Sequence, residues 1–305
     1  MRKRVSVFVG ADIHEVEGKS RLEEVLELVK PANPAIALLG GDHVGLSGPS
    51  KDIPEEERMR LWTPEFSIQK LRERISCALG GEVDSYFTYG SHDKKAAEGE
   101  AGFLAGAVST DYCHLYGISF SEMRFANERQ RSLDTRYDGI DSGTAENGAE
   151  RFSEWAAKID DHKPILVMSH MPLHKHRGDN LGASIWCEAL NKVAEKHDVF
   201  AFFAHNHTAE KRSNLDRQYY LIPAGNAMEV QGSEREESRH VTIHFTYLNA
   251  GYILKGCGTV LTFSDEDGDG KYDAVTVRRC AREEADTAFG DTGIFSPHTV
   301  ELRKN

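Results

Sequence analysis

Short apolar runs that alternate with helical patterns are the feature of this sequence that most constrains its fold. Five runs have the character of buried strands and occupy residues 5–11, 35–39, 86–89, 165–168 and 199–203. Apolar residues with helical spacing lie between them, which predicts helices over residues 20–30, from Pro54 or Pro64 through residue 79, around 152–159 and around 186–193. Such alternation favours right-handed crossovers and a mainly parallel sheet with helices on both faces. We therefore expect an α/β fold.

The last third of the chain has a different pattern. Runs that resemble strands follow one another without room for long helices, at residues 219–222, 241–246, 251–254, 259–263 and 272–277. We expect these runs to pair as antiparallel hairpins. Residues 119–150 show no apolar period and are predicted to be a loop or insertion. Because no internal repeat or linker is visible, we expect one domain over residues 1–280 and a tail over residues 281–305, whose order the sequence does not indicate.

Potential metal ligands follow each of the five early strand runs. These residues are Asp12, His14, Asp42, His92, His170, His205 and His207. Ligand sites of open α/β sheets lie beyond the carboxyl ends of the strands, so the same ligand chemistry at independent strand ends points to one shared crevice. A shell of imidazoles and carboxylates without cysteine suits Mn, Fe or Zn better than calcium or a structural zinc.

The order of these residues resembles a known series of motifs. In this chain the series is Asp12-x-His14, Gly41-Asp42, Gly90-Ser91-His92-Asp93, Ser169-His170 and Ala204-His205-Asn206-His207. It is similar to the series DxH, GD, GNH[DE], H and GHxH of the calcineurin-like metallophosphoesterases, and it covers about the first two thirds of the chain. The resemblance implies a four-layer α/β/β/α sandwich with mixed sheets and late antiparallel hairpins. It also implies a phosphatase or phosphodiesterase that activates water with two metal ions.

The resemblance further implies a role for each matching residue. One metal would be held by Asp12, His14 and His207, the other by His170 and His205 with Ser91 at the position of a further ligand, and Asp42 would bridge both. His92 would be the acid or phosphate-binding group, and Asp93 would orient it. The expected substrate is a small phosphorylated molecule.

Three positions depart from the family pattern. Ser91 stands where the family has asparagine, and a hydroxyl is a weaker and shorter ligand than an amide oxygen, so we expect a loosely held second metal. A degenerate scaffold that keeps the fold and binds a partner is therefore the alternative function. Ala204 replaces a glycine, which matters only where the turn requires positive φ. Gly45 does not supply the tyrosine of an Fe(III)-tyrosinate site.

Two other polar segments have open interpretations. The loop that contains His174, His176, Arg177 and Asp179 follows His170, and either substrate recognition or ordinary loop polarity explains it; the same holds for His43 beside Asp42. Asp265, Asp267 and Asp269 match the first half of a calcium loop, but Thr276 stands where a bidentate glutamate belongs. We favour an acidic hairpin turn and keep calcium binding as the alternative.

Composition excludes several classes of function. The 305 residues carry 37 Lys and Arg against 49 Asp and Glu, a formal charge of −12, which disfavours nucleic acid, a nuclease function and anionic membranes. Five widely spaced cysteines without a CxxC pair argue against a disulfide framework. No run approaches the roughly 18 apolar residues of a membrane span. We expect a cytoplasmic protein, although a chain trimmed of a secretory leader would have the same sequence. The sequence does not indicate the oligomeric state.

Overall fold

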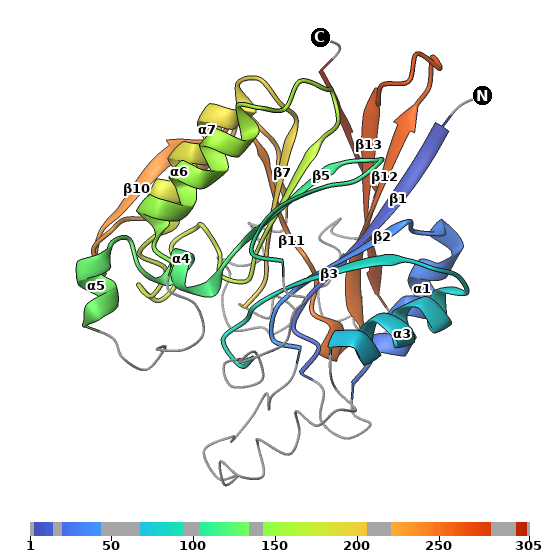
Figure 1. Cartoon of the computed structure of the whole chain (residues 1–305), viewed down its shortest axis with the longest axis horizontal. Helices are drawn as coiled ribbons and strands as arrows, with labels where there is room; N and C mark the ends of the chain where they lie inside the picture. Colours follow the sequence, from blue (N-terminus) through green and yellow to red (C-terminus); the bar gives the residue numbers. More distant parts are fainter. Residues whose placement is uncertain are drawn as a thin grey trace, which may run out of the picture.

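The computed structural model describes residues 3–14, 20–43, 68–93, 104–133, 143–205, 221–281 and 297–303, and the structural statements below concern these residues. Two six-stranded sheets pack against each other, and helices cover the outer face of each sheet (Figure 1). The layers are thus helix, sheet, sheet and helix. The predicted four-layer α/β/β/α sandwich is confirmed.

The first sheet combines the N-terminal strands with the last strands of the chain, in the order β14-β13-β12-β1-β2-β3. Its parallel strands are β1 (Lys3–Gly10), β2 (Ile36–Gly40) and β3 (Asp84–Thr88). Antiparallel pairing adds β12 (Cys257–Asp265), β13 (Ala274–Ala281) and β14 (His298–Glu301). Helices α1 (Leu22–Val29) and α3 (Ile68–Leu79) pack on its outer face, and the 3-10 helix η1 (Lys30–Ala32) follows α1.

The second sheet has the order β4-β5-β6-β7-β11-β8. Its parallel strands are β5 (His114–Ile118), β6 (Ile165–Ser169), β7 (Val199–Phe203) and β11 (Thr246–Asn249). The edges β4 (Gly106–Ser109) and β8 (Leu221–Ile222) are antiparallel to their neighbours. Helices α4 (Phe120–Arg124), α6 (Ala145–Ala156) and α7 (Ala183–Ala194) cover its outer face, beside the ribbon of β9 (Ala227–Gln231) and β10 (Ser238–Thr242). A separate short helix is α5 (Glu128–Ser132).

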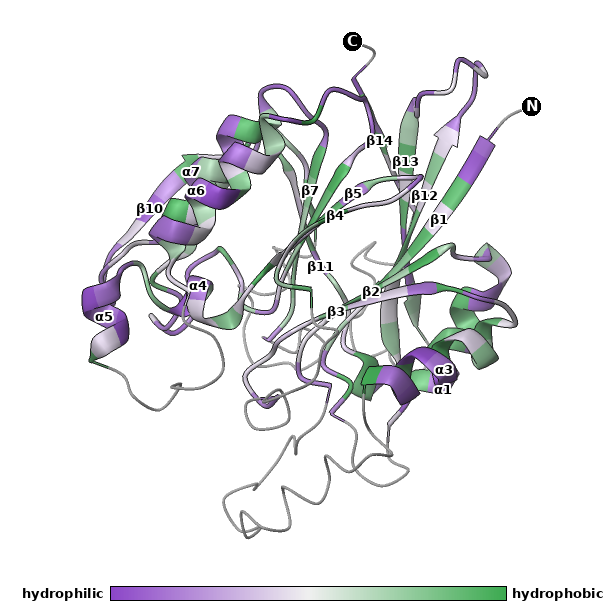
Figure 2. Cartoon of the chain, in the orientation of Figure 1, coloured by the Kyte–Doolittle hydropathy of each residue, from purple (hydrophilic) through white to green (hydrophobic). Residues whose placement is uncertain are grey.

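Apolar side chains fill the space between all four layers. Val7, Leu38, Leu166 and Phe200 are among those buried between the two sheets. The central strands are buried on both faces, which explains why they are nearly continuous apolar runs in the sequence. Figure 2 shows this as hydrophobic colour along the strands and polar colour on the outer sides of the helices. Within the described ranges, no helix combines the length and the apolar character that crossing a membrane requires.

The prediction of a loop over residues 119–150 is wrong. This stretch contains α4, α5 and the first half of α6. A capping box begins α4: the Ser119 hydroxyl accepts a hydrogen bond from the Glu122 amide, and Glu122 accepts one from the Ser119 amide. Both short helices have too few residues for a visible apolar period. Helix α6 begins at Ala145, well before residue 152. Its first buried residues, Ala145, Gly148 and Ala149, are small, so the sequence shows no clear apolar stripe in its first turns.

The predicted late hairpins are correct only in part. The pair β12 and β13 forms the expected antiparallel hairpin. Residues 241–246 are not one strand, because β10 ends at Thr242 and β11 begins at Thr246 and pairs parallel to β7. Residues 251–254 lead into the 3-10 helix η5 (Ile253–Lys255), whose first amide donates to the Ala11 carbonyl. The segment around Pro54 and residues 219–220 lie outside the described residues.

The last described segment joins the two sheets. Leu302 follows β14 and is buried in the layer between the sheets. The Arg303 amide donates to Oδ2 of Asp198 at 3.1 Å, directly before β7 of the second sheet. The described part of residues 281–305 is therefore a strand and a contact between the sheets.

The capping box of α4 provides a test of this fold. Ser119→Ala removes the hydroxyl that accepts the Glu122 amide, and we expect a loss of about 1 kcal/mol in the free energy of unfolding. Urea denaturation measures it. Ser132→Ala is the control, because the Ser132 hydroxyl donates to the Arg129 carbonyl on an exposed surface. Equal stability of both variants would contradict the capping role.

Candidate metal centre

The predicted ligands of the first sheet sit on strand ends with unusual backbone conformations. Asp12 and His14 follow β1 with φ of 53° and 45°, and Asp42 follows β2 with φ of 51°. In the second sheet, His205 follows β7 with φ of 68°. Non-glycine residues pay an energetic cost in this left-handed region, and such conformations concentrate at functional sites. The chain therefore turns sharply at the points where the predicted ligands lie.

Backbone hydrogen bonds hold the ends of β1 and β2 together. The Asp12 amide donates to the Gly41 carbonyl at 3.1 Å, and the His14 amide donates to the Asp42 carbonyl at 2.9 Å. Parallel pairing of β1 and β2 thus continues past the strands into the loops. As a result, the side chains of Asp12, His14 and Asp42 lie at fixed positions relative to one another.

The Asp42 carboxylate lies at the centre of the cluster. Its Oδ1 accepts the His92 amide at 2.7 Å, and its Oδ2 lies 3.3 Å from Nε2 of His170 in the second sheet. The ring nitrogens of His14 and His92 lie 3.8 and 3.9 Å from Oδ2. Two groups of side chains have ligand atoms close enough for one ion, namely His14 with Asp42 and His92, and Asp42 with His170 and His205. Asp42 belongs to both groups.

Burial and charge shift the protonation of the central pair. Burial alone would raise the pKa of Asp42, but the charge and hydrogen bond of His170, with help from His92 and His14, lower that pKa well below its ordinary value. Burial alone would lower the pKa of His170, but Asp42 raises it to about 9. Both shifts favour an ionised carboxylate beside an imidazolium. A metal ion bound by Asp42 and His170 would displace the imidazolium proton on Nε2 of His170.

The hydrogen bonds of His170 orient its ring. Nδ1 lies 2.8 Å from the Gly40 carbonyl, which can only accept, so Nδ1 is the donor. Nε2 therefore faces Asp42 and lies 3.1 Å from Nδ1 of His205. A carbonyl partner on the far nitrogen is the usual way in which proteins fix the orientation of a metal-binding imidazole.

Ser91 and His92 reach Asp42 from the turn after β3. The Ser91 hydroxyl donates to Asp42 at 3.1 Å from Oδ2 and 3.3 Å from Oδ1. The side chain of His92 is 38% exposed, in contrast to the fully buried His14 and His170, and its ring centroid lies 5.1 Å from that of His14. Among the described residues of the cluster, His92 is therefore the most exposed to solvent.

Asp93 and His43 connect the loops that carry this cluster. The buried Asp93 carboxylate accepts the amides of His43 and Gly90, both at 2.9 Å. Nε2 of His43 lies 3.0 Å from the Thr88 carbonyl. Through these bonds Asp93 holds the turn after β3 against the turn after β2. His43 in turn connects the turn after β2 to Thr88 at the end of β3. The orientation of His92 by Asp93 stays a prediction.

Two glycines allow the loops to approach each other closely. A Cβ on Gly41, whose φ is 82°, would lie 2.6 Å from the Cα of Gly90. A Cβ on Gly90 would overlap the amide nitrogen and the carboxylate of Asp42. Glycine at both positions is therefore a requirement of the site.

Other residues of the early predictions lie around this cluster or beyond the described part of the chain. The rings of His176 and His205 have centroids 5.5 Å apart, and Nδ1 of His174 lies 3.0 Å from the Tyr247 hydroxyl. Asp179 is 3.9 Å from Arg124. His207 and Gly45 lie outside the described residues.

No pattern in the sequence indicates that Tyr252 lies beside the cluster. The ring of the buried Tyr252 stands edge-on to His14, with centroids 6.4 Å apart. Tyr252 precedes η5, in a stretch that the sequence predicts to be a strand. Only the fold brings it to the end of β1.

The acidic segment 265–273 forms the turn of the β12–β13 hairpin, as favoured from the sequence. Asp265 accepts the amides of Gly268 at 2.6 Å and Gly270 at 3.1 Å. Asp265, Asp267 and Asp269 also lie close enough to share an ion. Calcium binding here stays the less favoured alternative.

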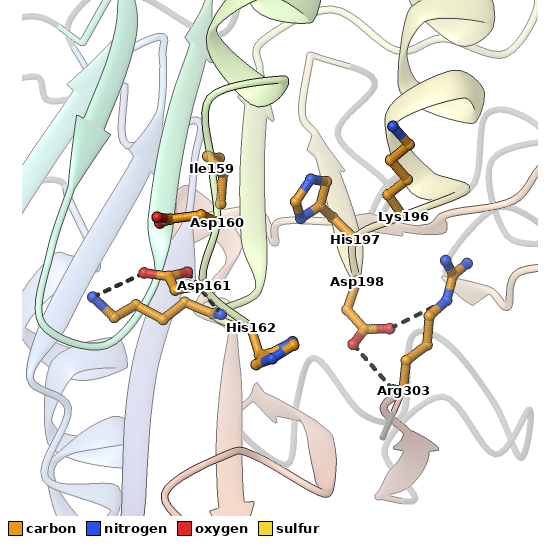
Figure 3. A pocket seen from close by; sticks show the side chains of 9 residues that line it. Ile159, Asp160, Asp161, His162, Lys196, His197, Asp198 and Arg303 are labelled. Carbon is orange, nitrogen blue, oxygen red and sulfur yellow. Dashed lines mark hydrogen bonds and ion pairs between the residues drawn. The ribbon is translucent and has the colours of Figure 1, made fainter. Parts of the chain in front are cut away.

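A cavity of about 190 Å³ lies at the opposite end of the second sheet, where β6 and β7 begin. Figure 3 shows the ion pair between Asp198 and Arg303 at this cavity. Asp161 forms a second ion pair, with Oδ2 3.4 Å from Nζ of Lys163. Asp161 also lies 2.8 Å from Nε2 of His114. No group of potential metal ligands occurs among the described residues that line it. The cavity is therefore separate from the cluster around Asp42.

Comparison with known proteins gives one match to a family. A family model described as calcineurin-like phosphoesterase matches residues 5–209. No curated protein matches the chain. GAP50, described as the anchor in the inner membrane complex of Plasmodium, aligns with a TM-score of 0.48 at 8% identity, over 99% of this chain and 90% of its own. Phosphopantetheinyl hydrolase (PptH) from Mycobacterium tuberculosis aligns with a TM-score of 0.37 at 12% identity, over 82% and 90%. At these TM-scores, neither likeness bears on function.

The close approach of Gly90 to Asp42 gives a test of the cluster. Gly90→Ala forces the turn after β3 away from Asp42, so we expect a loss of roughly 1–3 kcal/mol in unfolding free energy and weaker Mn²⁺ binding. Urea denaturation and equilibrium dialysis measure the two effects. Gly81→Ala is the control, because nothing lies within 4 Å of a Cβ there. Equal behaviour of the two variants would contradict the geometry described above.

Proposed function

Because the chain belongs to the calcineurin-like phosphoesterase family, we propose that it is a metal-dependent phosphoester hydrolase with a dinuclear centre. The observation that supports two ions is the membership of Asp42 in both groups of potential ligands. A carboxylate has two oxygens and can bind one ion with each. The expected substrate is a small phosphorylated molecule, because the formal charge of −12 disfavours long nucleic acids.

The side chains around Asp42 have the chemistry that such ions require. Imidazole and carboxylate ligands suit Mn, Fe or Zn, and the Gly40 carbonyl already orients the His170 ring. Asp12 and His14 would hold one ion together with His207. His170 and His205 would hold the other, and Asp42 would bridge the two. Among them, the buried Asp12, His14 and Asp42 are held in place by the backbone bonds between the ends of β1 and β2.

In the proposed reaction, the ions would polarise the phosphoryl group and the attacking water. The residues of the chain supply position and protons. Asp42, His14 and His170 fix where the phosphoryl group can lie, since they are buried and hydrogen-bonded. His92 lies beside them and is open to solvent, so its ring can bind the phosphate or donate a proton to the leaving oxygen.

Ser91 supports an alternative function. Its hydroxyl donates to the Asp42 carboxylate, which uses part of the capacity that a bridging ligand needs. A chain with a weak second site could keep the fold and serve as a binding scaffold. The number of bound metals discriminates, because less than one equivalent under ample Mn²⁺ or Zn²⁺ would favour the scaffold.

The role of His92 can be tested by its removal. We expect His92→Ala to retain the metal content of the wild type and to lower turnover of p-nitrophenyl phosphate by roughly 10²- to 10⁴-fold, since a general acid typically contributes this much. Metal analysis and initial rates give the two values. His240→Ala, on the exposed strand β10, is the control. Hydrolase function is rejected if wild-type protein stays inactive on mono- and diesters after stripping and reloading with Mn²⁺, Fe²⁺ or Zn²⁺.

The weak second site can be tested by restoring the family residue. Ser91→Asn replaces the hydroxyl with an amide oxygen that reaches farther, so we expect about tenfold tighter binding of the second Mn²⁺. Ser91→Ala is the matched control, because it removes the bond to Asp42 without adding a ligand. Titration calorimetry separates the two binding steps. If Asn and Ala bind the second ion equally, Ser91 does not limit that site.

A further inference from the structure

The loop between β6 and α7 places a buried histidine beside one of the proposed metal ligands. His176 is buried, and its ring stands nearly perpendicular to that of His205, at an interplanar angle of 75° and a centroid separation of 5.5 Å. His170 contacts the same ring of His205, with centroids 5.0 Å apart. The His205 ring is therefore in contact with two imidazoles, both from the segment that follows β6.

This contact matters because the backbone alone does not direct His205. The residue lies past the end of β7 with φ of 68°, where the regular alternation of strand side chains no longer applies. A metal ligand nevertheless needs a fixed ring orientation. Neighbouring side chains must supply that orientation, and His176 is one of the two whose rings pack on His205 in the described part of the chain.

The loop itself is fixed by the Tyr247 hydroxyl of β11. The hydroxyl accepts the Leu173 amide at 2.8 Å and lies 3.0 Å from Nδ1 of His174. The Tyr247 ring stacks on Phe203 of β7 with centroids 4.6 Å apart. Tyr247 therefore connects the loop to β7, the strand that His205 follows.

Two further hydrogen bonds fix the loop on either side of His176. The Asn180 side chain donates to the His174 carbonyl at 2.9 Å, and the Lys175 amide donates to the Glu229 carbonyl of β9 at 3.0 Å. His176 lies between these anchored residues, so it has little freedom to move relative to the second sheet. A ring mounted in this way can hold a neighbouring ring in one orientation.

We infer that His176 is a positioning residue that fixes the orientation of His205 as a metal ligand, through packing of the two rings. The inference rests on the proposed function, because it requires that His205 binds a metal. It assigns the His176 side chain to metal affinity and not to recognition of the substrate. Tyr247 acts at a greater distance, through the loop that holds His176.

The test measures Mn²⁺ affinity by calorimetry, without substrate, in wild type, His176→Ala, His176→Phe and Tyr247→Phe. We expect His176→Ala to weaken binding at the site of His205 by about 10- to 100-fold, the usual effect of removing a side chain that supports a ligand. His176→Phe keeps a ring of similar shape and should stay within about threefold of wild type. Tyr247→Phe loses the hydroxyl anchor and should weaken binding by several fold. His162→Phe, on the exposed α6–β6 turn, is the control.

The outcomes separate this inference from the proposed function. If wild type binds none of Mn²⁺, Fe²⁺ and Zn²⁺ in the same titration, the proposed function fails. If wild type binds and His176→Ala binds equally well, the inference is overturned, and a change confined to KM for a phosphoester would instead indicate substrate recognition. A loss in His176→Phe as large as in His176→Ala also overturns it, because packing of the rings would then not be the cause. A loss of Mn²⁺ affinity supports the inference only if the variant and wild type have the same melting temperature in EDTA.

Discussion

The continuation of β1–β2 pairing beyond the strands is the interaction on which the site depends. The bonds from Asp12 to Gly41 and from His14 to Asp42 hold the turns in left-handed conformations that an isolated peptide would avoid. The cost of these turns is met by the sheet behind them, which is buried on both faces. A flexible loop with the same residues could not keep three candidate ligand side chains so close together. The site is therefore a property of the whole first sheet.

The second sheet contributes the other half of the cluster, and Asp42 is where the two halves meet. His170 reaches across from the end of β6 to within 3.3 Å of its carboxylate. The mutual attraction lowers the pKa of Asp42 and raises that of His170, which offsets the cost of burying both groups. Any shift between the sheets would separate this pair. Apolar packing between the sheets thus keeps the two halves of the cluster together.

Much of this arrangement could be predicted from the sequence because each candidate ligand comes shortly after an apolar run, as Asp42 does after β2. Features that depend on packing between distant segments could not. The five residues of α4 are too short for a periodic signal, and Tyr252 reaches His14 only through the fold. Asp93 is another example: its neighbour in sequence is His92, but the amides of two loops determine where its carboxylate points. Local patterns reveal which residues end a strand, whereas tertiary contacts decide what those residues touch.

The order of strands in the first sheet has a consequence for how the chain is made. β1 is the first strand in the sequence, yet Lys3 pairs with Asp265 of β12, one of the last. During synthesis, one edge of β1 must remain without its final neighbour until residues 257–265 have left the ribosome. Pairing over such long sequence separations slows folding and leaves exposed strand edges that can join other chains. The completed first sheet is therefore a late product of folding, and aggregation of nascent chains is the hazard that this topology carries.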